Sequence, residues 1–167
     1  MSLVLPSHRA LNGLSALACF TAMGVALYLQ YAANLEPCPL CIFQRVAMIA
    51  TALVFALAFV HNPQSIGVRI YAALASLTAL SGAGIAGRHV WLQHLPADEV
   101  PSCGPGLNYL IETLPFSRML AIVLRGSGEC AKIDWTFLGF TLPELTLAVF
   151  AGLVVIGLFQ LVRRKHG

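Results

Sequence analysis

The stretch LPELTLAVFAGLVVIGLFQLV, residues 142–162, decides the fold class. Apart from Glu144 near its start, every side chain in it is uncharged. As an α-helix it would be about 31 Å long, which matches the ~30 Å hydrocarbon core of a bilayer. The stretch therefore predicts a helix that spans a membrane.

The rest of the chain has the same character. Hydrophobic residues make up 58% of the sequence and charged residues 10%, and the mean hydropathy is +0.80. Soluble domains carry about 25% charged residues, so this chain cannot cover a soluble surface. The first apolar stretch is too long for the core of a signal peptide, and no small-residue cleavage site follows it. We predict an all-α membrane protein, a single-domain four-helix transmembrane bundle over residues 1–167 with spans at about 11–33, 42–60, 70–92 and 142–162.

The distribution of charge predicts the topology. Arg9, Arg69 and the tail 163–165 are basic, and the segments around them contain no acid. All seven acidic residues lie in or beside the loops at about 34–41 and 93–141. The positive-inside rule then places both termini and the turn at 61–69 in the cytoplasm and the two other loops outside. The basic residues behind the net charge of +3 form no broad patch, so nucleic acid is not an expected partner. The apolar spans make a lipid bilayer the expected partner.

Four of the five cysteines fall in the outward loops, and Cys19 is expected to be a small buried hydrophobe in the first span. In an oxidising bacterial periplasm the other four predict two disulfides, Cys38–Cys41 and Cys103–Cys130. A Cys-x-x-Cys ring closes almost no loop, so its usual uses are redox chemistry and metal binding. A disulfide between Cys103 and Cys130 closes a ring of about 28 residues and would stabilise the fold by ~3–4 kcal/mol. A purely structural role for this disulfide is therefore an open alternative.

Zinc is the competing interpretation of the four outward cysteines. Four-cysteine zinc sites are usually built from two short Cys-x-x-Cys knuckles. Here 26 residues separate Cys103 from Cys130, and an oxidising compartment disfavours thiolate ligands. We therefore predict no metal site.

The sequence CPLCIFQR, residues 38–45, places a cysteine and a cation at the start of the second span. A helix that begins near Cys41 would favour a thiolate in its first turn, and Pro39 is tolerated at such a start. Arg45 follows Cys41 by four residues, so the two share a helix face and can flank one pocket. The alternative for Arg45 is that it snorkels to the lipid headgroups.

The third span ends in GRHVWLQH, residues 87–94, at the same outer face. His89 is a candidate hydrogen-bond donor to a bound polar group, Trp91 an aromatic-belt anchor and Arg88 a headgroup contact. A thiolate beside a cation and a donor, open to lipid, suits a membrane-soluble electron acceptor. A quinone is such an acceptor, because its ring is apolar and its reduced oxygens gain charge that a cation stabilises.

The long outer loop is too long for a passive connection. Apolar residues in 107–128 recur at roughly helical spacing, which predicts one or two short helices on the membrane surface. Pro115 and the internal charges make these pieces too short for a fifth and sixth span. The segments 101–106 and 126–132 are expected to be flexible and to carry Cys103 and Cys130.

Taken in order, CPLCIFQR, GRHVWLQ, a lone cysteine in a long outer loop and GSGECAKIDWTFLGFTLPE (126–144) resemble the disulfide bond formation protein B (DsbB) family. The likeness covers nearly the whole chain. It implies a protein-dithiol:quinone oxidoreductase of the bacterial inner membrane. Such an enzyme reoxidises the periplasmic thiol oxidase DsbA and passes electrons to ubiquinone in air, or to menaquinone otherwise.

The resemblance also implies a role for each outward cysteine. Cys103 is the sulfur that reduced DsbA attacks, and Cys130 is its disulfide partner. Cys130 then attacks Cys38, which frees the Cys41 thiolate to approach the quinone.

By the same resemblance, Arg45 and His89 lie near the quinone. Gln44 departs from the pattern, since some family members carry an acid before the arginine, which changes the local charge. Reduction potentials agree with redox-active cysteine pairs. The reduction potential of DsbA is about −120 mV, and that of ordinary structural disulfides is below about −300 mV, a gap of roughly 8 kcal/mol for two electrons. A relaxed staple at Cys103–Cys130 could not reoxidise DsbA.

Two alternatives differ in class. A vitamin K epoxide reductase type of enzyme also uses a membrane Cys-x-x-Cys and a quinone, but there the motif lies late in the chain. A non-enzymatic membrane scaffold with stapled loops would have disulfides that resist exchange with DsbA.

Overall fold

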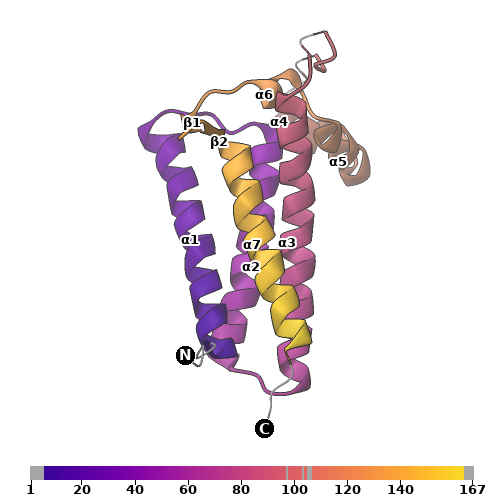
Figure 1. Ribbon diagram of the computed structural model, residues 1–167. Coiled ribbons are helices and arrows are strands. Elements are labelled where there is room, and N and C mark those ends of the chain that lie inside the picture. Colours follow the sequence, from indigo (N-terminus) through magenta and orange to yellow (C-terminus); the bar gives the residue numbers. More distant parts are fainter. Residues whose placement is uncertain (1–5, 97, 103, 105–106, 164–167) are drawn as a thin grey trace.

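The computed structural model describes residues 6–96, 98–102, 104 and 107–163. Four helices in it are long and apolar enough to cross a membrane: α1 (His8–Ala32), α2 (Pro39–His61), α3 (Ile66–Gln93) and α7 (Leu142–Val162). They run alongside one another, with both ends of the described chain at the same end of the bundle (Figure 1). The four-helix prediction is confirmed.

Helix α7 begins and ends at the predicted residues, but α1, α2 and α3 begin three or four residues before the predicted starts. Polar capping groups explain two of these differences. The Ser7 hydroxyl accepts a hydrogen bond from the Ala10 amide at 3.1 Å, and Cys38 Sγ accepts one from the Cys41 amide at 3.3 Å. Side chains that satisfy the first N–H groups extend a helix beyond its apolar run.

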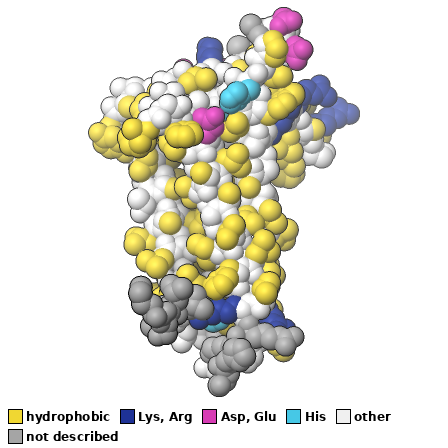
Figure 2. Space-filling view, in the orientation of Figure 1, with side chains coloured by type: hydrophobic (Ala, Val, Ile, Leu, Met, Phe, Trp, Pro, Cys, Tyr) yellow, Lys and Arg dark blue, Asp and Glu magenta, His cyan; other side chains and the backbone are white. Residues whose placement is uncertain are grey.

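The space-filling view agrees with a membrane-spanning body. Apolar and uncharged side chains cover the middle of the visible face, and the charged side chains gather toward its two ends (Figure 2). Many large apolar residues are exposed along the helices, among them Leu17, Phe20, Leu53, Leu77 and Val155. An exposed apolar belt of this kind is suited to contact lipid rather than water.

Small residues let the helices approach one another closely. The main core contains Ala47, Ala52, Ala75, Ala79 and Ala86, with Phe55 and Phe150 filling the remaining space. Gly82 of α3 faces Phe150 of α7, and a Cβ at Gly82 would overlap that ring. Helix packing in membranes depends on such small residues because lipid tails are as apolar as the side chains.

Replacing Gly82 by alanine is expected to destabilise the fold by about 1–3 kcal/mol, because the added methyl group overpacks the contact with Phe150. Gly84 of the same helix is the matched control, since nothing lies within 4 Å of a Cβ there. There the change should be neutral or stabilising, by up to about 1 kcal/mol of helix propensity. Thermal unfolding in detergent measures both, and equal shifts in the two variants would contradict close packing at Gly82.

A buried polar contact joins α1 to α7 near the chain ends. Gln160 Nε2 donates to Asn12 Oδ1 at 3.0 Å, and both side chains are buried. Toward the opposite end of the bundle, residues of the same two helices line a large cavity.

The connection between α3 and α7 packs at that opposite end (Figure 1). It contains α4 (Leu107–Thr113), α5 (Phe116–Arg125) and α6 (Gly128–Ala131), and then a hairpin of β1 (Thr136–Phe137) and β2 (Phe140–Thr141). Helices α4 and α5 are the short helices predicted from spacing, and their position on a membrane surface stays a prediction. A second apolar core joins them to the bundle through Leu40, Leu92, Leu110, Met119, Val123 and Cys130.

The expectation of a flexible segment at 126–132 is wrong. These residues include α6, and Cys130 within it is 1% exposed. The physical reason is that Cys130 supplies part of the second apolar core, so the segment is held by packing.

Candidate active site

Three cysteines meet where α2 begins. Cys38 is the N-cap residue of α2, and Cys41 lies in its first turn, with the two Sγ atoms 3.1 Å apart. Cys130 of α6 belongs to the second apolar core, and Cys38 packs against that core. Cys38 thus adjoins a sulfur from its own motif and the core that holds a sulfur from the long loop. Cys103 lies outside the described residues.

The Cys38 thiol affects the pKa of Cys130, which belongs to the core that Cys38 packs against. The hydrogen bond from Cys38 lowers the pKa of the Cys130 thiol to about 6, with Ser127 and the Leu40 backbone adding to the effect and burial opposing it. The same hydrogen bond raises the pKa of Cys38. While Cys38 is a thiol, this interaction favours the thiolate form of Cys130, the form in which a cysteine acts as a nucleophile.

His89 of α3 lies against the cysteine pair. Its Nε2 is 3.8 Å from Cys38 Sγ, and its Nδ1 is 3.9 Å from Cys41 Sγ. Gln44 of α2 approaches the same ring, with Nε2 2.9 Å from His89 Nδ1. Both Gln44 and His89 are buried. The imidazole therefore contacts the two sulfurs and one amide.

Arg45 is half-buried and is held by α1. Its guanidinium donates to Gln30 Oε1 through Nη1 and to the Ala26 carbonyl at 3.2 Å through Nη2. A guanidinium has five N–H donors, so these two contacts leave others for a ligand. The charge sits at a fixed place beside the first turn of α2.

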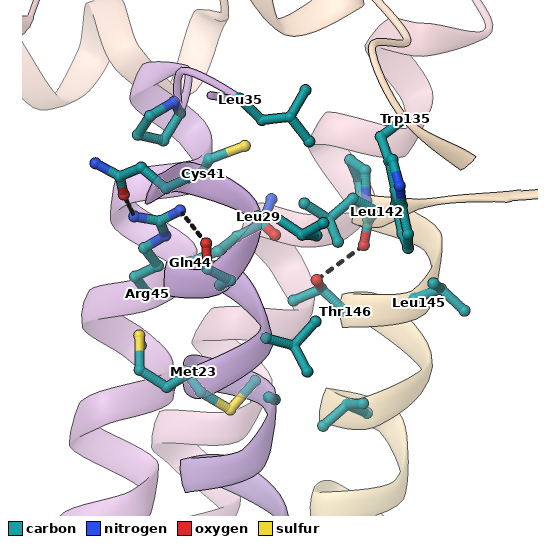
Figure 3. A pocket seen from close by; sticks show the side chains of 18 of the residues that line it. Met23, Leu29, Leu35, Cys41, Gln44, Arg45, Trp135, Leu142, Leu145 and Thr146 are labelled. Atoms are coloured by element: carbon teal, nitrogen blue, oxygen red, sulfur yellow. Dashed lines mark hydrogen bonds between the residues drawn. The ribbon is translucent and has the colours of Figure 1, made fainter. Parts of the chain in front are cut away.

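A cavity of about 1170 Å³ opens at this place. Figure 3 shows Cys41 and Arg45 on one side of it and Trp135, Leu142 and Leu145 on the facing side. The lining deeper in the bundle is apolar and comes from α1 and α7, including Leu14, Leu17, Val25 and Val149. Charged residues of the loops line it as well, namely Glu36, Glu129, Lys132 and Asp134. The cavity is large enough for a drug-sized molecule.

Cys38, Cys41 and His89 also form a cluster in which one ligand atom from each lies within 4.8 Å of the others. Two thiolates on a tetrahedral zinc stand about 3.8 Å apart, given Zn–S bonds of about 2.3 Å. The two sulfurs here are closer, at 3.1 Å, and the two ring nitrogens of His89 face different sulfurs. This geometry suits a dithiol pair better than a metal site.

The structure thus brings five of the six predicted site residues, Cys38, Cys41, Arg45, His89 and Cys130, to one end of the bundle. Two contacts were not predicted from the sequence. Gln30 holds Arg45, and Gln44 contacts His89. The sequence did contain a signal for both glutamines, since each is a polar residue within an apolar span. Such residues are costly in a membrane and often have a functional role. Arg88 donates to the carbonyls of Leu124 and Arg125, and its contact with headgroups stays a prediction.

Comparisons with known proteins agree on one family. The family model described as Disulfide bond formation protein DsbB matches residues 8–160. Disulfide bond formation protein B of Acinetobacter baumannii is 57% identical over 158 residues, which cover 94% of this chain and 92% of that protein. The protein of the same name from Acinetobacter baylyi is 54% identical over 95% of this chain and 93% of its own length. The one from Nitrosococcus oceani is 52% identical over 89% of this chain and 88% of its own length.

Proposed function

The chain belongs to the DsbB family of disulfide bond formation proteins, and from that premise we propose that it is a protein-dithiol:quinone oxidoreductase. Membership makes it a multi-pass membrane protein and a thiol oxidoreductase that serves disulfide bond formation. The proposal adds the electron donor, a DsbA-like periplasmic thiol oxidase, and the acceptor, a membrane quinone. It also places the cysteine-bearing loops in the periplasm of a bacterial inner-membrane protein.

One observation carries the proposal. Cys38 Sγ lies 3.1 Å from Cys41 Sγ and Cys38 packs against the apolar core that contains Cys130, so it adjoins both the Cys-x-x-Cys partner and the core that holds the long-loop cysteine. A non-enzymatic scaffold with two separate structural disulfides does not require the two cysteine pairs to lie next to each other. A relay of disulfide exchange requires it, because each exchange is an attack by one sulfur on another in direct contact.

The forward half of the relay moves oxidation from the chain to DsbA. A DsbA thiolate attacks Cys103 of a Cys103–Cys130 disulfide, forms a mixed disulfide and expels Cys130 as a thiolate. Cys130 then attacks Cys38 of the Cys38–Cys41 disulfide, and Cys41 leaves as a thiolate that keeps the electron pair of the broken bond. Cys130 leaves the first exchange already as a thiolate, which is the form that attacks a disulfide.

The return half restores the first pair. The second DsbA cysteine attacks the mixed disulfide, which releases oxidised DsbA and the Cys103 thiolate. Cys103 attacks Cys130, and Cys38 leaves as a thiolate beside Cys41. The chain now holds a reduced Cys38/Cys41 pair, and each exchange has broken one disulfide and formed one.

The cavity supports a quinone as the acceptor. Its deep lining is apolar, as a prenylated ring and tail require, and Cys41 and Arg45 both line it. A bound quinone supplies an acceptor for two electrons and two protons, and so allows Cys38 and Cys41 to form their disulfide again. Arg45 would hold negative charge on a ligand oxygen, because a preorganised cation in a water-poor site stabilises such charge strongly. Ubiquinone is the proposed acceptor, with menaquinone the alternative without oxygen.

Changing Cys130 to serine tests the order of attack. The partner is a DsbA whose second cysteine is serine, so neither Cys130 nor DsbA itself can resolve the mixed disulfide with Cys103, and a covalent adduct should accumulate. Non-reducing electrophoresis and intact mass after mixing with DsbA show it as the sum of the two chains, cleaved by dithiothreitol. Because Cys130→Ser leaves Cys103 reduced, the variant is first charged with a small-thiol mixed disulfide.

The control is the double variant Cys103→Ser/Cys130→Ser, which should give no adduct after the same charging. An adduct that persists in the double variant would place the attack on another cysteine. Absence of any adduct with Cys130→Ser would contradict the proposed entry point for electrons.

A further inference from the structure

The contact between Gln44 and His89 lies inside the bundle, beside the cysteine pair. Gln44 is 5% exposed and His89 2% exposed, and they come from different helices. Gln44 Nε2 is 2.9 Å from His89 Nδ1, much closer than the 3.8 and 3.9 Å between the ring and the two sulfurs. The amide is therefore the strongest hydrogen-bonding partner of the imidazole.

This contact determines which ring nitrogen carries the proton. An amide NH₂ group only donates, so Nδ1 must offer its lone pair to Gln44. A neutral imidazole has one N–H, which must then be on Nε2, the nitrogen that faces Cys38. We infer that Gln44 is a positioning residue that holds His89 in the Nε2–H tautomer, with the N–H directed at Cys38 Sγ.

The tautomer limits what His89 can do to each sulfur. The nitrogen nearest Cys41 is Nδ1, and its lone pair is already used by Gln44. His89 in this form cannot accept a proton from Cys41, and it can donate a hydrogen bond to Cys38. It is a donor to the cysteine pair rather than a base.

The consequence for chemistry rests on the proposed function. In the relay Cys41 leaves the Cys38–Cys41 disulfide as a thiolate and needs no base. Cys38 is also expelled as a thiolate, when Cys103 attacks Cys130, and negative charge then develops on the sulfur that Nε2–H faces. A donor held at the site of developing charge speeds such a step. Gln44 acts on that step through His89.

Gln44 also lines the cavity, so direct contact with a bound molecule is the rival role. The two roles predict different kinetics. A contact residue changes the quinone concentration needed for half-maximal rate, whereas a positioning residue changes the maximal rate.

Nitrogen NMR of the full chain in detergent, labelled with ¹⁵N-histidine and without DsbA or quinone, reads the tautomer directly. A His89→Asn variant identifies the His89 signals. In the wild-type chain Nε2 should be protonated and Nδ1 unprotonated. Gln44→Glu, which keeps the size of the side chain, should give a protonated Nδ1, because a carboxylate only accepts. Gln44→Leu should give a mixture of both tautomers.

Gln160→Leu is the matched control. Gln160 is also a buried glutamine, but its Oε1 is 3.4 Å from His8 Nδ1 at the other end of the bundle. This change should move the His8 signals and leave those of His89 in place. A protonated Nδ1 in the wild-type chain, or the same His89 spectrum in Gln44→Glu, would overturn the inference.

Turnover with reduced DsbA and a short-chain ubiquinone gives the second test. Gln44→Leu should lower the maximal rate about five- to tenfold, the effect of losing one buried hydrogen bond, with the half-saturating quinone concentration unchanged within about twofold. A raised half-saturating concentration at an unchanged maximal rate would make Gln44 a quinone contact instead. If the wild-type chain reduced no quinone, the proposed function would fail while the NMR result still decided the tautomer.

Discussion

Changing Cys41 to serine should lower quinone-dependent turnover by at least about a thousandfold, the size of loss seen when a reacting side chain is removed. A serine oxygen cannot form a disulfide with Cys38, so Cys130 has no disulfide to attack and electrons stop at the Cys103/Cys130 pair. Cys38 and Cys41 both line the cavity, and Cys41 does so from within the first turn of α2. Rates of quinone loss with reduced DsbA measure the effect.

Entry of electrons should survive this change. Cys103 and Cys130 are untouched, so Cys41→Ser should still exchange disulfides with DsbA in a single turnover. Cys19→Ser is the matched control, because Cys19 is fully buried in the main core of the bundle, a different core from the one that contains Cys130. It should retain turnover. Unchanged turnover in Cys41→Ser would remove Cys41 from the electron path.

Changing Arg45 to alanine should lower kcat/KM for quinone by about a hundredfold, within the range for the loss of one charge-stabilising group. The guanidinium lines the cavity in a half-buried position, where it is weakly screened. The dependence on DsbA concentration should change much less, because Arg45 is on the cavity side of the cysteine pair. Initial rates with each substrate varied in turn measure the two effects.

Two companion variants separate charge from structure. Gln30→Leu removes the partner that holds Arg45 and keeps the charge, so its loss should be smaller than that of Arg45→Ala. Arg118→Ala removes an exposed arginine of α5 and should change neither substrate dependence. A larger effect of Arg45→Ala on DsbA than on quinone would make Arg45 a docking residue.

The spans were predictable because a membrane places a simple demand on sequence. Every backbone polar group in the hydrocarbon region must be satisfied, so a long apolar run can only be a helix or part of a closed barrel. Helix starts were less certain because they depend on capping. Residues such as Ser7 and Cys38 satisfy amides ahead of the apolar run and move the start outward.

The site was predictable where its residues are close in sequence. The i to i+4 spacing placed Cys41 and Arg45 at one cavity. Contacts across the fold were not predictable: the burial of Cys130 against Leu40 depends on how α6 packs, and Gln44 and His89 are joined across two helices. The β1–β2 hairpin was also missed, because its strands have two residues each and its turn places Leu138 at a positive φ of 52°.

The central claim is that electrons pass from a protein dithiol through these cysteines to a quinone. The most direct test mixes the purified chain in detergent with reduced DsbA and a soluble ubiquinone analogue, and follows quinone absorbance. The account predicts quinone loss that requires both DsbA and Cys41. Absence of quinone loss with the wild-type chain, with Cys38, Cys41, Cys103 and Cys130 locked in disulfides that DsbA does not reduce, would contradict it and make the cysteine pairs structural staples.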